Sequence, residues 1–178
     1  MKNKGFTMIE LLISLGISSI VIGLIFSFFT VNYKSYKSIR NDSELQFQAQ
    51  YILNYMADKI INSSSVSLIR GEAAIYSMTL VRNAETEYPV NKISFKFGNN
   101  SDENYVFHIV NSNIRYTVGE KDIKPTAELG NFVDSMYVSL LKDDSFQHTN
   151  AVIVKIIMNR DGQMYEAWVR RFRQKHQW

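Results

Sequence analysis

The stretch MKNKGFTMIELLISLGISSIVIGLIFSFF (residues 1–29) decides how this chain can fold. The 23 residues from Leu11 to Tyr33 include no charged side chain, and roughly 20 apolar residues are enough for a helix to span a bilayer. An ordinary secretory signal has a shorter apolar core, followed by a small-residue cleavage site. The stretch therefore predicts a membrane-spanning helix that is not removed on the far side of the membrane.

The charges that flank this span predict its orientation. Lys2 and Lys4 precede the apolar run, and short positively charged segments stay on the cytoplasmic side. We therefore expect a single-pass protein of the cytoplasmic (inner) membrane, with its N-terminus inside and the chain from Asn32 onward outside.

Composition limits what the rest of the chain can be. The 178 residues are 46% hydrophobic, which is enough for the core of about one domain besides the span. The chain contains no cysteine, which excludes disulfides, thiol nucleophiles and Cys-ligated metals. Without Lys2 and Lys4, 18 Lys and Arg stand against 17 Asp and Glu, so bulk charge gives no argument for a phosphate-bearing partner.

Glu10 is the unusual residue of the apolar stretch. A carboxylate in a spanning helix costs roughly 2.5 to 3.5 kcal/mol on insertion scales, and such residues usually have a partner or a function. The simplest interpretation is that the side chain reaches the membrane interface. Its setting favours a function, because a short basic leader, Gly5, Phe6 and Thr7 precede it and an unbroken apolar helix follows.

This arrangement closely resembles the class III signal of type IV pilins and of the pseudopilins of type II secretion and DNA-uptake systems. The resemblance implies that a prepilin peptidase cleaves the chain between Gly5 and Phe6 and methylates the new amino group of Phe6. Glu10 then occupies the position at which the family keeps its glutamate. Within the family, the strand-rich C-terminal part is most similar to J-type pseudopilins and W-type minor pilins.

The chemistry of the processed end predicts an assembly contact. Cleavage removes both leader lysines and leaves a cationic amine on Phe6, close to Glu10 and next to hydrocarbon. In a stack of parallel helices the amine of one subunit can meet the Glu10 carboxylate of its neighbour, so that each buried charge gains a partner. We therefore interpret Glu10 as an assembly residue and not as a catalyst.

The resemblance also implies the partners of the chain. These are other pilins or pseudopilins through the N-terminal helix, the prepilin peptidase, and an assembly platform protein with its ATPase, which would build an extracellular or periplasmic filament. Two departures from the major pilins favour a minor pilin of the priming or tip complex: Ser27 stands where many major pilins have a helix-kinking proline, and the paired cysteines are absent.

The expected domain organisation follows the hydrophobic pattern. Residues 1–5 form the leader, residues 6–31 the membrane and assembly half of a helix, and residues 32–178 the extracytoplasmic domain, with the helix continuing to about residue 62. Apolar residues at helical spacing predict one buried stripe on this helix, formed by Leu45, Ala49, Ile52, Met56 and Ile60. A neighbouring aromatic stripe of Phe47, Tyr51 and Tyr55 is expected to pack in the core against a sheet.

After a turn expected at residues 62–65, alternating apolar residues predict strands. The expected strands cover residues 75–81, 93–97, 105–109, 114–118, 132–141, 151–158 and 164–172, with a hairpin loop at 98–104 and a tight turn at 160–163. The connections are too short for crossover helices, so an antiparallel sheet is expected. The predicted fold class is α+β, a long N-terminal helix packed on an antiparallel sheet.

Motifs of catalysis and metal binding are not found in the sequence. There is no nucleophile elbow, zinc-protease motif or phosphate-binding glycine loop, and His108 is expected to be structural. Asp143, Asp144 and Asp161 lack the spaced ligand series of a calcium loop and predict turns instead. We expect neither enzymatic activity nor a cofactor or metal.

The C-terminal segment VRRFRQKHQW is the one local concentration of charge. Arg170, Arg171, Arg173 and Lys175 alternate with aromatic residues and could contact DNA or an acidic pilin surface, although a solvated strand end is the favoured interpretation. Two alternatives to the minor pilin therefore stay open, a signal-anchored extracytoplasmic binding domain and a pilin-fold subunit for DNA capture. The system served, whether motility, adhesion, secretion or DNA uptake, is not encoded in any motif.

Overall fold

The computed structural model describes residues 7–72, 74–97 and 103–172. These residues form one helix followed by nine strands. The elements are α1 (Met8–Ile61), β1 (Ser63–Arg70), β2 (Tyr88–Val90), β3 (Lys92–Phe97), β4 (Asn104–Val110), β5 (Asn113–Gly119), β6 (Ala127–Gly130), β7 (Val133–Leu140), β8 (Ala151–Arg160) and β9 (Gln163–Phe172).

The chain divides into two compact units, one ending at Asn41 and one beginning at Asp42, and α1 contributes to both. In the first unit every side chain from Thr7 to Phe29 is exposed, although most of them are apolar. An 18-residue window of α1 has a mean hydropathy of 2.4 and is not buried at all. A helix that is apolar all round and has no protein around it is suited to a membrane or to a bundle of similar helices.

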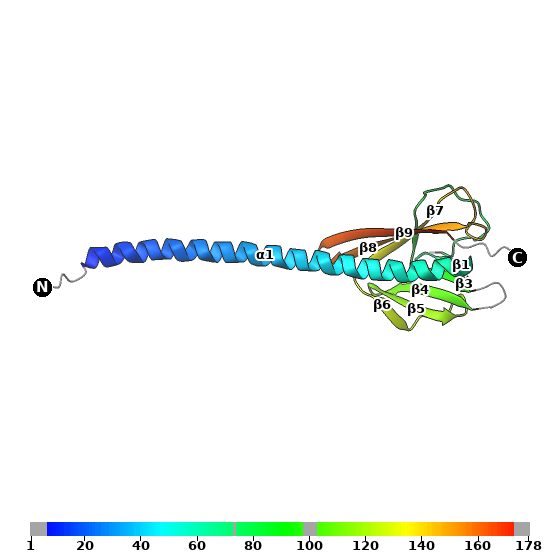
Figure 1. Ribbon diagram of the computed structural model, residues 1–178, viewed down its shortest axis with the longest axis horizontal. Helices are drawn as coiled ribbons and strands as arrows, with labels where there is room; N and C mark the ends of the chain where they lie inside the picture. The colour runs from blue at the N-terminus through cyan, green and yellow to red at the C-terminus, as the bar shows by residue number, and fades with distance from the viewer. Residues whose placement is uncertain (1–6, 73, 98–102, 173–178) are drawn as a thin grey trace. The chain divides into compact units, whose positions relative to one another are not determined.

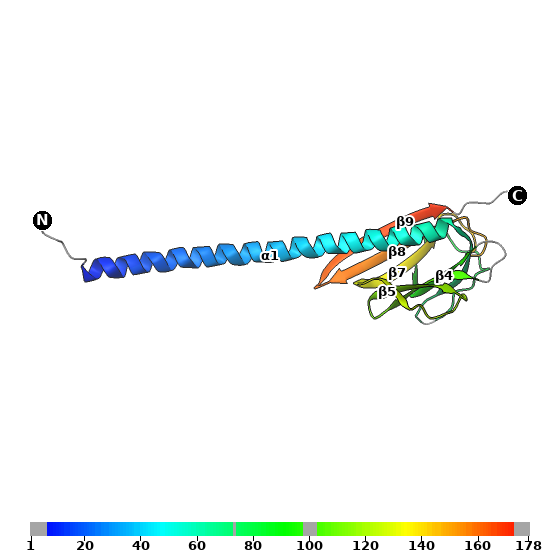
Figure 2. The same cartoon turned by 60° about the horizontal axis from the view of Figure 1, so that its bottom comes forward.

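The second unit contains two antiparallel sheets (Figure 1). One has five strands in the order β1-β3-β4-β5-β6, and the other has four in the order β2-β7-β8-β9. Both sheets contribute to one hydrophobic cluster, which also includes the part of α1 from Leu45 to Ile60. Figure 2 shows this end of α1 running beside β8 and β9. The predicted α+β architecture is confirmed, but the strands form two sheets where one was expected.

The predicted apolar stripe is the centre of this core. Its five residues, Leu45, Ala49, Ile52, Met56 and Ile60, are completely buried. On the five-strand side, Phe95 and Phe107 are buried too and their rings meet edge to face at 6.3 Å. The helix approaches β6 so closely that a β-carbon added to Gly130 would lie 2.7 Å from Cδ1 of Ile52.

The expectation that the neighbouring aromatic stripe packs in the core was wrong for two of its three members. Phe47 is 69% exposed and Tyr51 is 52% exposed. Only Tyr55, nearer the end of the helix, contacts the sheet, with its ring 4.9 Å from that of Tyr116. The two sheets pack against one side of α1. Phe47 and Tyr51 lie on a different side of the helix, and their side chains therefore stay exposed.

The helix ends at Ile61, as predicted, but the polar run after it is not a turn. Only Asn62 is turn, and its backbone N–H still donates to the carbonyl of Asp58. The hydroxyl of Ser63 donates to the carbonyl of Ile60 at 2.7 Å, and Ser63 already pairs with β3. These serines therefore begin β1. This strand was not predicted, because serine is a residue that favours turns.

The strand expected at residues 75–81 was also wrong. Ile75 forms one isolated bridge with Arg70, Arg82 forms another with Asp144, and bends lie between them. The side chains of this segment do alternate, since Tyr76 and Met78 pack on the core. The segment nevertheless lacks a neighbouring strand along its length, because it passes from one sheet to the other.

The remaining predicted strands are present with small shifts of their ends, whereas β2 and β6 were not predicted. The expected tight turn is confirmed, with Asp161 at φ 53° and Gly162 at φ 82° between β8 and β9. Both residues lie in the left-handed region that a two-residue hairpin turn requires. The expected hairpin loop at 98–104 lies mostly outside the described residues.

The contact of Gly130 with Ile52 gives a test of this packing. We expect Gly130→Ala to destabilise the second unit by about 1 to 3 kcal/mol, because the added methyl group overlaps Ile52. The measurement is urea unfolding of the full chain in detergent. Ile52→Val removes Cδ1, the atom closest to the added methyl group, and leaves Cγ1 at 2.9 Å, so the double variant should lose less stability than the sum of the two single changes. Strict additivity would contradict the close approach.

Candidate functional site

Glu10 lies in the first turn of α1 and takes part in the N-terminal cap of this helix. The Glu10 carboxylate accepts hydrogen bonds from the backbone N–H of Thr7 at 2.9 Å and from its hydroxyl at 2.8 Å. The Thr7 hydroxyl in turn accepts from the backbone N–H of Glu10 at 3.4 Å. With Thr7 as the N-cap and Glu10 three residues later, this is a reciprocal capping box.

The capping role was not predicted, although the sequence shows the pattern Thr-x-x-Glu directly before the apolar run. A glutamate in the first turn also interacts favourably with the helix dipole. Glu10 therefore has a structural role within one subunit, as part of the helix cap. The predicted processing residues Gly5 and Phe6 lie outside the described residues, and their expected roles stay predictions.

The helix that carries Glu10 is built for contact with apolar surroundings. Several of its hydroxyl groups bond to their own helix: Ser14 donates to the carbonyl of Glu10 at 2.6 Å, Ser19 to that of Gly16 at 2.7 Å and Thr30 to that of Phe26 at 2.9 Å. Polar groups that bond to their own helix can be placed in hydrocarbon without an orphaned donor. Glu10 is the one acidic residue between Thr7 and Tyr33.

Comparison with protein-family models gives one match. Residues 1–26 match the prokaryotic N-terminal methylation motif. This motif is the signature of type IV pilins and pseudopilins, and it confirms the resemblance seen in the sequence. The match ends within α1 and does not extend to the second unit. Comparisons with curated proteins and with solved structures gave no match.

The pilin-type signal and the apolar helix together define the N-terminal site. They identify a single-pass, membrane-anchored protein with a methylation signal, of the kind that prepilin peptidase processes and that associates with other pilins. The likeness to J-type and W-type proteins, the direction of insertion and the place in a filament stay predictions.

The predicted C-terminal basic residues are only partly described. Arg170 is exposed on β9 and lies opposite Ile153 of β8. Arg173 and Lys175 lie outside the described residues, as does the side chain of Arg171. Arg170 lines a groove of about 290 Å³ that also contains Glu85, Glu87 and Glu166. The DNA or pilin contact at these residues stays a prediction. Lys155 also lines the groove and binds Glu87 and Glu166 at 3.3 Å, but the three carboxylates outnumber the two described cations and would oppose a polyanion there.

A serine and a histidine meet in the second unit. Ser145 Oγ lies 3.0 Å from Nδ1 of His148, and the hydroxyl also accepts from the backbone N–H of His148. Ser145 is buried, however, and the contact is made between residues three apart in one turn. Among the described residues His148 forms no hydrogen bond with a carboxylate, so the arrangement is typical of a local turn.

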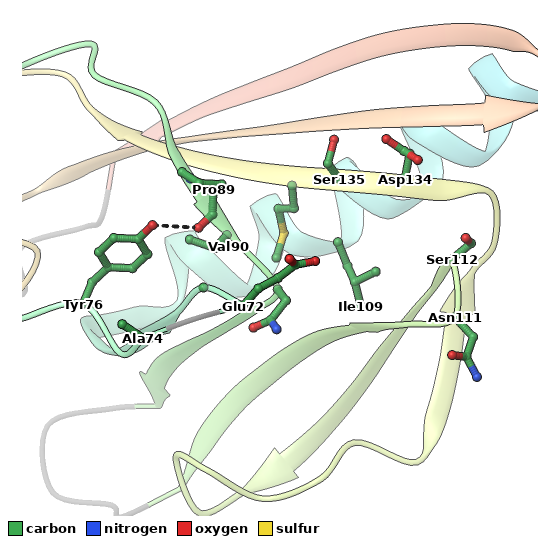
Figure 3. A pocket seen from close by; sticks show the side chains of 13 residues that line it. Glu72, Ala74, Tyr76, Pro89, Val90, Ile109, Asn111, Ser112, Asp134 and Ser135 are labelled. Carbon is green, nitrogen blue, oxygen red and sulfur yellow. Dashed lines mark hydrogen bonds between the residues drawn. The ribbon is translucent and has the colours of Figure 1, made fainter.

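One cavity, shown in Figure 3, lies between the two sheets. It measures about 510 Å³, and Glu72 and Asp134 are its only charged lining residues among those described. Tyr76 closes one end by donating to the carbonyl of Pro89 at 3.0 Å. No histidine or cysteine lines it, and it offers no paired nucleophile and base.

A row of four basic residues and one acidic residue crosses the outer face of the five-stranded sheet, and Lys92 is the buried member of it. Arg70, Lys92, His108, Arg115 and Glu128 are successive cross-strand partners. The Lys92 side chain is only 4% exposed and bonds to the carboxylate and the carbonyl of Asp122, at 2.7 and 2.8 Å. Asp122 also binds Arg70 at 2.7 Å. The segment carrying Asp122 therefore covers a sheet face that the alternation of β3 would leave to solvent.

The pKa of His108 depends on the charged groups of this row. Burial and the neighbouring Lys92, together with Arg70 and Lys124, hold the pKa of His108 below its ordinary value, and Asp122 opposes them only weakly. Hydrogen bonds from Lys92 and then from Arg70 lower the pKa of the Asp122 carboxyl in turn, against its partial burial. Folding therefore disfavours a protonated His108 and favours an ionised Asp122.

These shifts predict how stability changes with pH. An unfolded histidine binds a proton below about pH 6.5, whereas folded His108 resists it, so stability should fall as the pH drops from about 7 to 5. One such group gives a slope of at most about 1.4 kcal/mol per pH unit. The stabilisation from Asp122 is lost only at lower pH, below about 4. Urea unfolding of wild type and His108→Gln measures the effect, and equal slopes between pH 7 and 5 would contradict it.

Proposed function

We propose that this protein is a structural subunit, a minor pilin or pseudopilin, of a type IV pilus or a type II secretion-like filament. It is cleaved between Gly5 and Phe6 by prepilin peptidase, methylated on Phe6, and assembled through its N-terminal helix. The observation that carries this proposal is the methylation motif at residues 1–26, on a helix whose side chains from Thr7 to Phe29 are all exposed in the described structure.

The two parts of α1, one in each unit of the chain, support a subunit role in different ways. The membrane half presents apolar side chains on all sides, and these can be buried only by lipid or by other helices. In the second unit, Phe47 and Tyr51 extend an exposed aromatic face along the helix, on a side that neither sheet covers. Exposed aromatic residues of this kind are enriched at protein interfaces.

The proposed place in the assembly is the priming or tip complex at the inner membrane. Support comes from the sequence of α1, which has Ser27 in place of a kinking proline and is helical without interruption from Met8 to Ile61. A platform protein and an ATPase would extract the subunit from the bilayer, and its second unit would face the periplasm or the exterior.

Processing is the first test. We expect the chain produced together with prepilin peptidase to begin at methylated Phe6, and the chain produced without it to retain Met1. Intact mass and N-terminal sequencing distinguish the two forms. An uncleaved chain in both cases would overturn the proposal and leave a signal-anchored binding domain as the better interpretation.

The second test separates the two uses of Glu10. Glu10→Gln preserves a side chain that can complete the capping box with Thr7 but removes the charge. If the charge pairs with the methylated amine of a neighbour, we expect processing to continue and the amount of subunit in purified filaments to fall about tenfold or more, because a buried charge without its partner is costly.

Thr7→Ala is the matched control for that experiment. It weakens the cap at Glu10, at a cost of about 0.5 to 2 kcal/mol, but leaves the carboxylate charged. We expect it to enter filaments at nearly the wild-type level. If Glu10→Gln assembles normally while Thr7→Ala does not, the carboxylate acts as a helix cap and the assembly contact is wrong.

A further inference from the structure

The edges of the two sheets differ in how they are protected. Sheet edges expose unpaired backbone groups, and proteins usually blunt them with short strands, prolines or irregular pairing. Strand β2 has three residues including Pro89, β6 has four residues, and the pairing of β1 with β3 contains two register shifts. Each of these three edges carries such a device.

Strand β9 carries none of them. It runs for ten residues, Gln163–Phe172, without proline or glycine, and its register with β8 is unbroken along its whole length. It is the last strand of its sheet, with no strand paired to its other side among the described residues. A long, regular edge is a ready template for another strand.

The hairpin turn determines which backbone groups face outward. Arg160 and Gln163 pair directly across the two-residue turn, so they form a hydrogen-bonded pair, and such pairs recur at every second residue. The backbones of Tyr165, Ala167 and Val169 therefore face β8. The N–H and C=O groups that face the free edge belong to Met164, Glu166, Trp168 and Arg170, and no hydrogen bond is found for them within the described residues.

Side chains and space along this edge fit an added chain. Met164 is 62% exposed and Trp168 is 67% exposed, a costly arrangement for large apolar groups that stay in water. Beside β9 lies a groove of about 510 Å³, which its residues 165–170 share with Gln50, Leu53 and Asn54 of α1. The alternating donors and acceptors are complementary to an extended backbone, and a helix, which satisfies its own groups, cannot match them.

We propose that β9 is a docking edge that binds an extended segment of a partner protein by β-strand addition. The side chains of β9 specify the chemistry of that segment when it runs antiparallel. An acidic residue lies beside Arg170, an apolar residue beside Trp168 and a basic residue beside Glu166, because cross-strand pairs of this kind stabilise a sheet. This inference concerns the second unit alone and holds whether or not the chain is processed at Gly5.

The experiment uses the full-length protein in detergent and a synthetic peptide. The peptide alternates threonine with Asp, Val, Lys and Leu, in the order that places them beside Arg170, Trp168, Glu166 and Met164. Hydrogen exchange is followed residue by residue by NMR. We expect slower exchange at the amides of Glu166, Trp168 and Arg170, and unchanged exchange at Tyr165, Ala167 and Val169, which already bond to β8. A peptide with Asp and Lys exchanged should bind more weakly.

Two variants test the side chain and the backbone separately. Trp168→Thr keeps a residue suited to strands and should weaken peptide binding about tenfold. Leu80→Thr, which changes an exposed apolar residue away from β9, should leave binding unchanged. Glu166→Pro removes one outward N–H without removing a bond to β8, and proline is tolerated in this way on edge strands. It should fold and fail to bind.

Several outcomes would overturn the proposal. Peptide binding that slows exchange outside β9, or a folded Glu166→Pro that binds as well as wild type, would show that the edge is not the site. No protection at β9 with either peptide would also overturn it. Protection of the outward amides without peptide, together with a dimer by sedimentation, would assign the edge to a second copy of the chain.

Discussion

The burial of one stripe of α1 between two sheets is the interaction on which the rest of the second unit depends. Leu45, Ala49, Ile52, Met56 and Ile60 are spaced so that they share one side of the helix, and all of them are inaccessible to solvent. Because each sheet is antiparallel and has one inner face, a single helix can be covered by both. At Gly130 the helix and β6 approach so closely that even a β-carbon would require Ile52 to move.

The same helix has no comparable stripe before Asp42, and this contrast explains the division of the chain. The span from Leu11 to Tyr33 carries no charge and is apolar on every side, so no sheet could cover it and leave a polar face to water. Its apolar surface must be buried by something outside the chain. The methylation motif at residues 1–26 and the self-satisfied hydroxyl groups of Ser14 and Thr30 both agree with a membrane or helical environment.

The parts of this structure that the sequence predicted are those with a strong period or a specific motif. The long helix, its buried stripe, the β8–β9 hairpin and the N-terminal signal were all predicted correctly. The strand β1 was missed because its first residues are serines, which favour turns locally. The division into two sheets depends on long-range pairing of short strands such as β2, whose Pro89 argues against a strand. The burial of Lys92 depends on Asp122, thirty residues away.

Glu10 shows why the chemistry of a site is harder to predict than its position. The sequence placed an isolated carboxylate at the start of an apolar helix, and charge pairing between subunits was one way to account for it. The structure adds a second, because the same carboxylate accepts two hydrogen bonds from Thr7. The two uses are compatible, since an ionised carboxylate has several acceptor positions. Both bonds from Thr7 reach Oε2, so the proposed contact with the amine of a neighbouring subunit can use Oε1 while the cap stays intact.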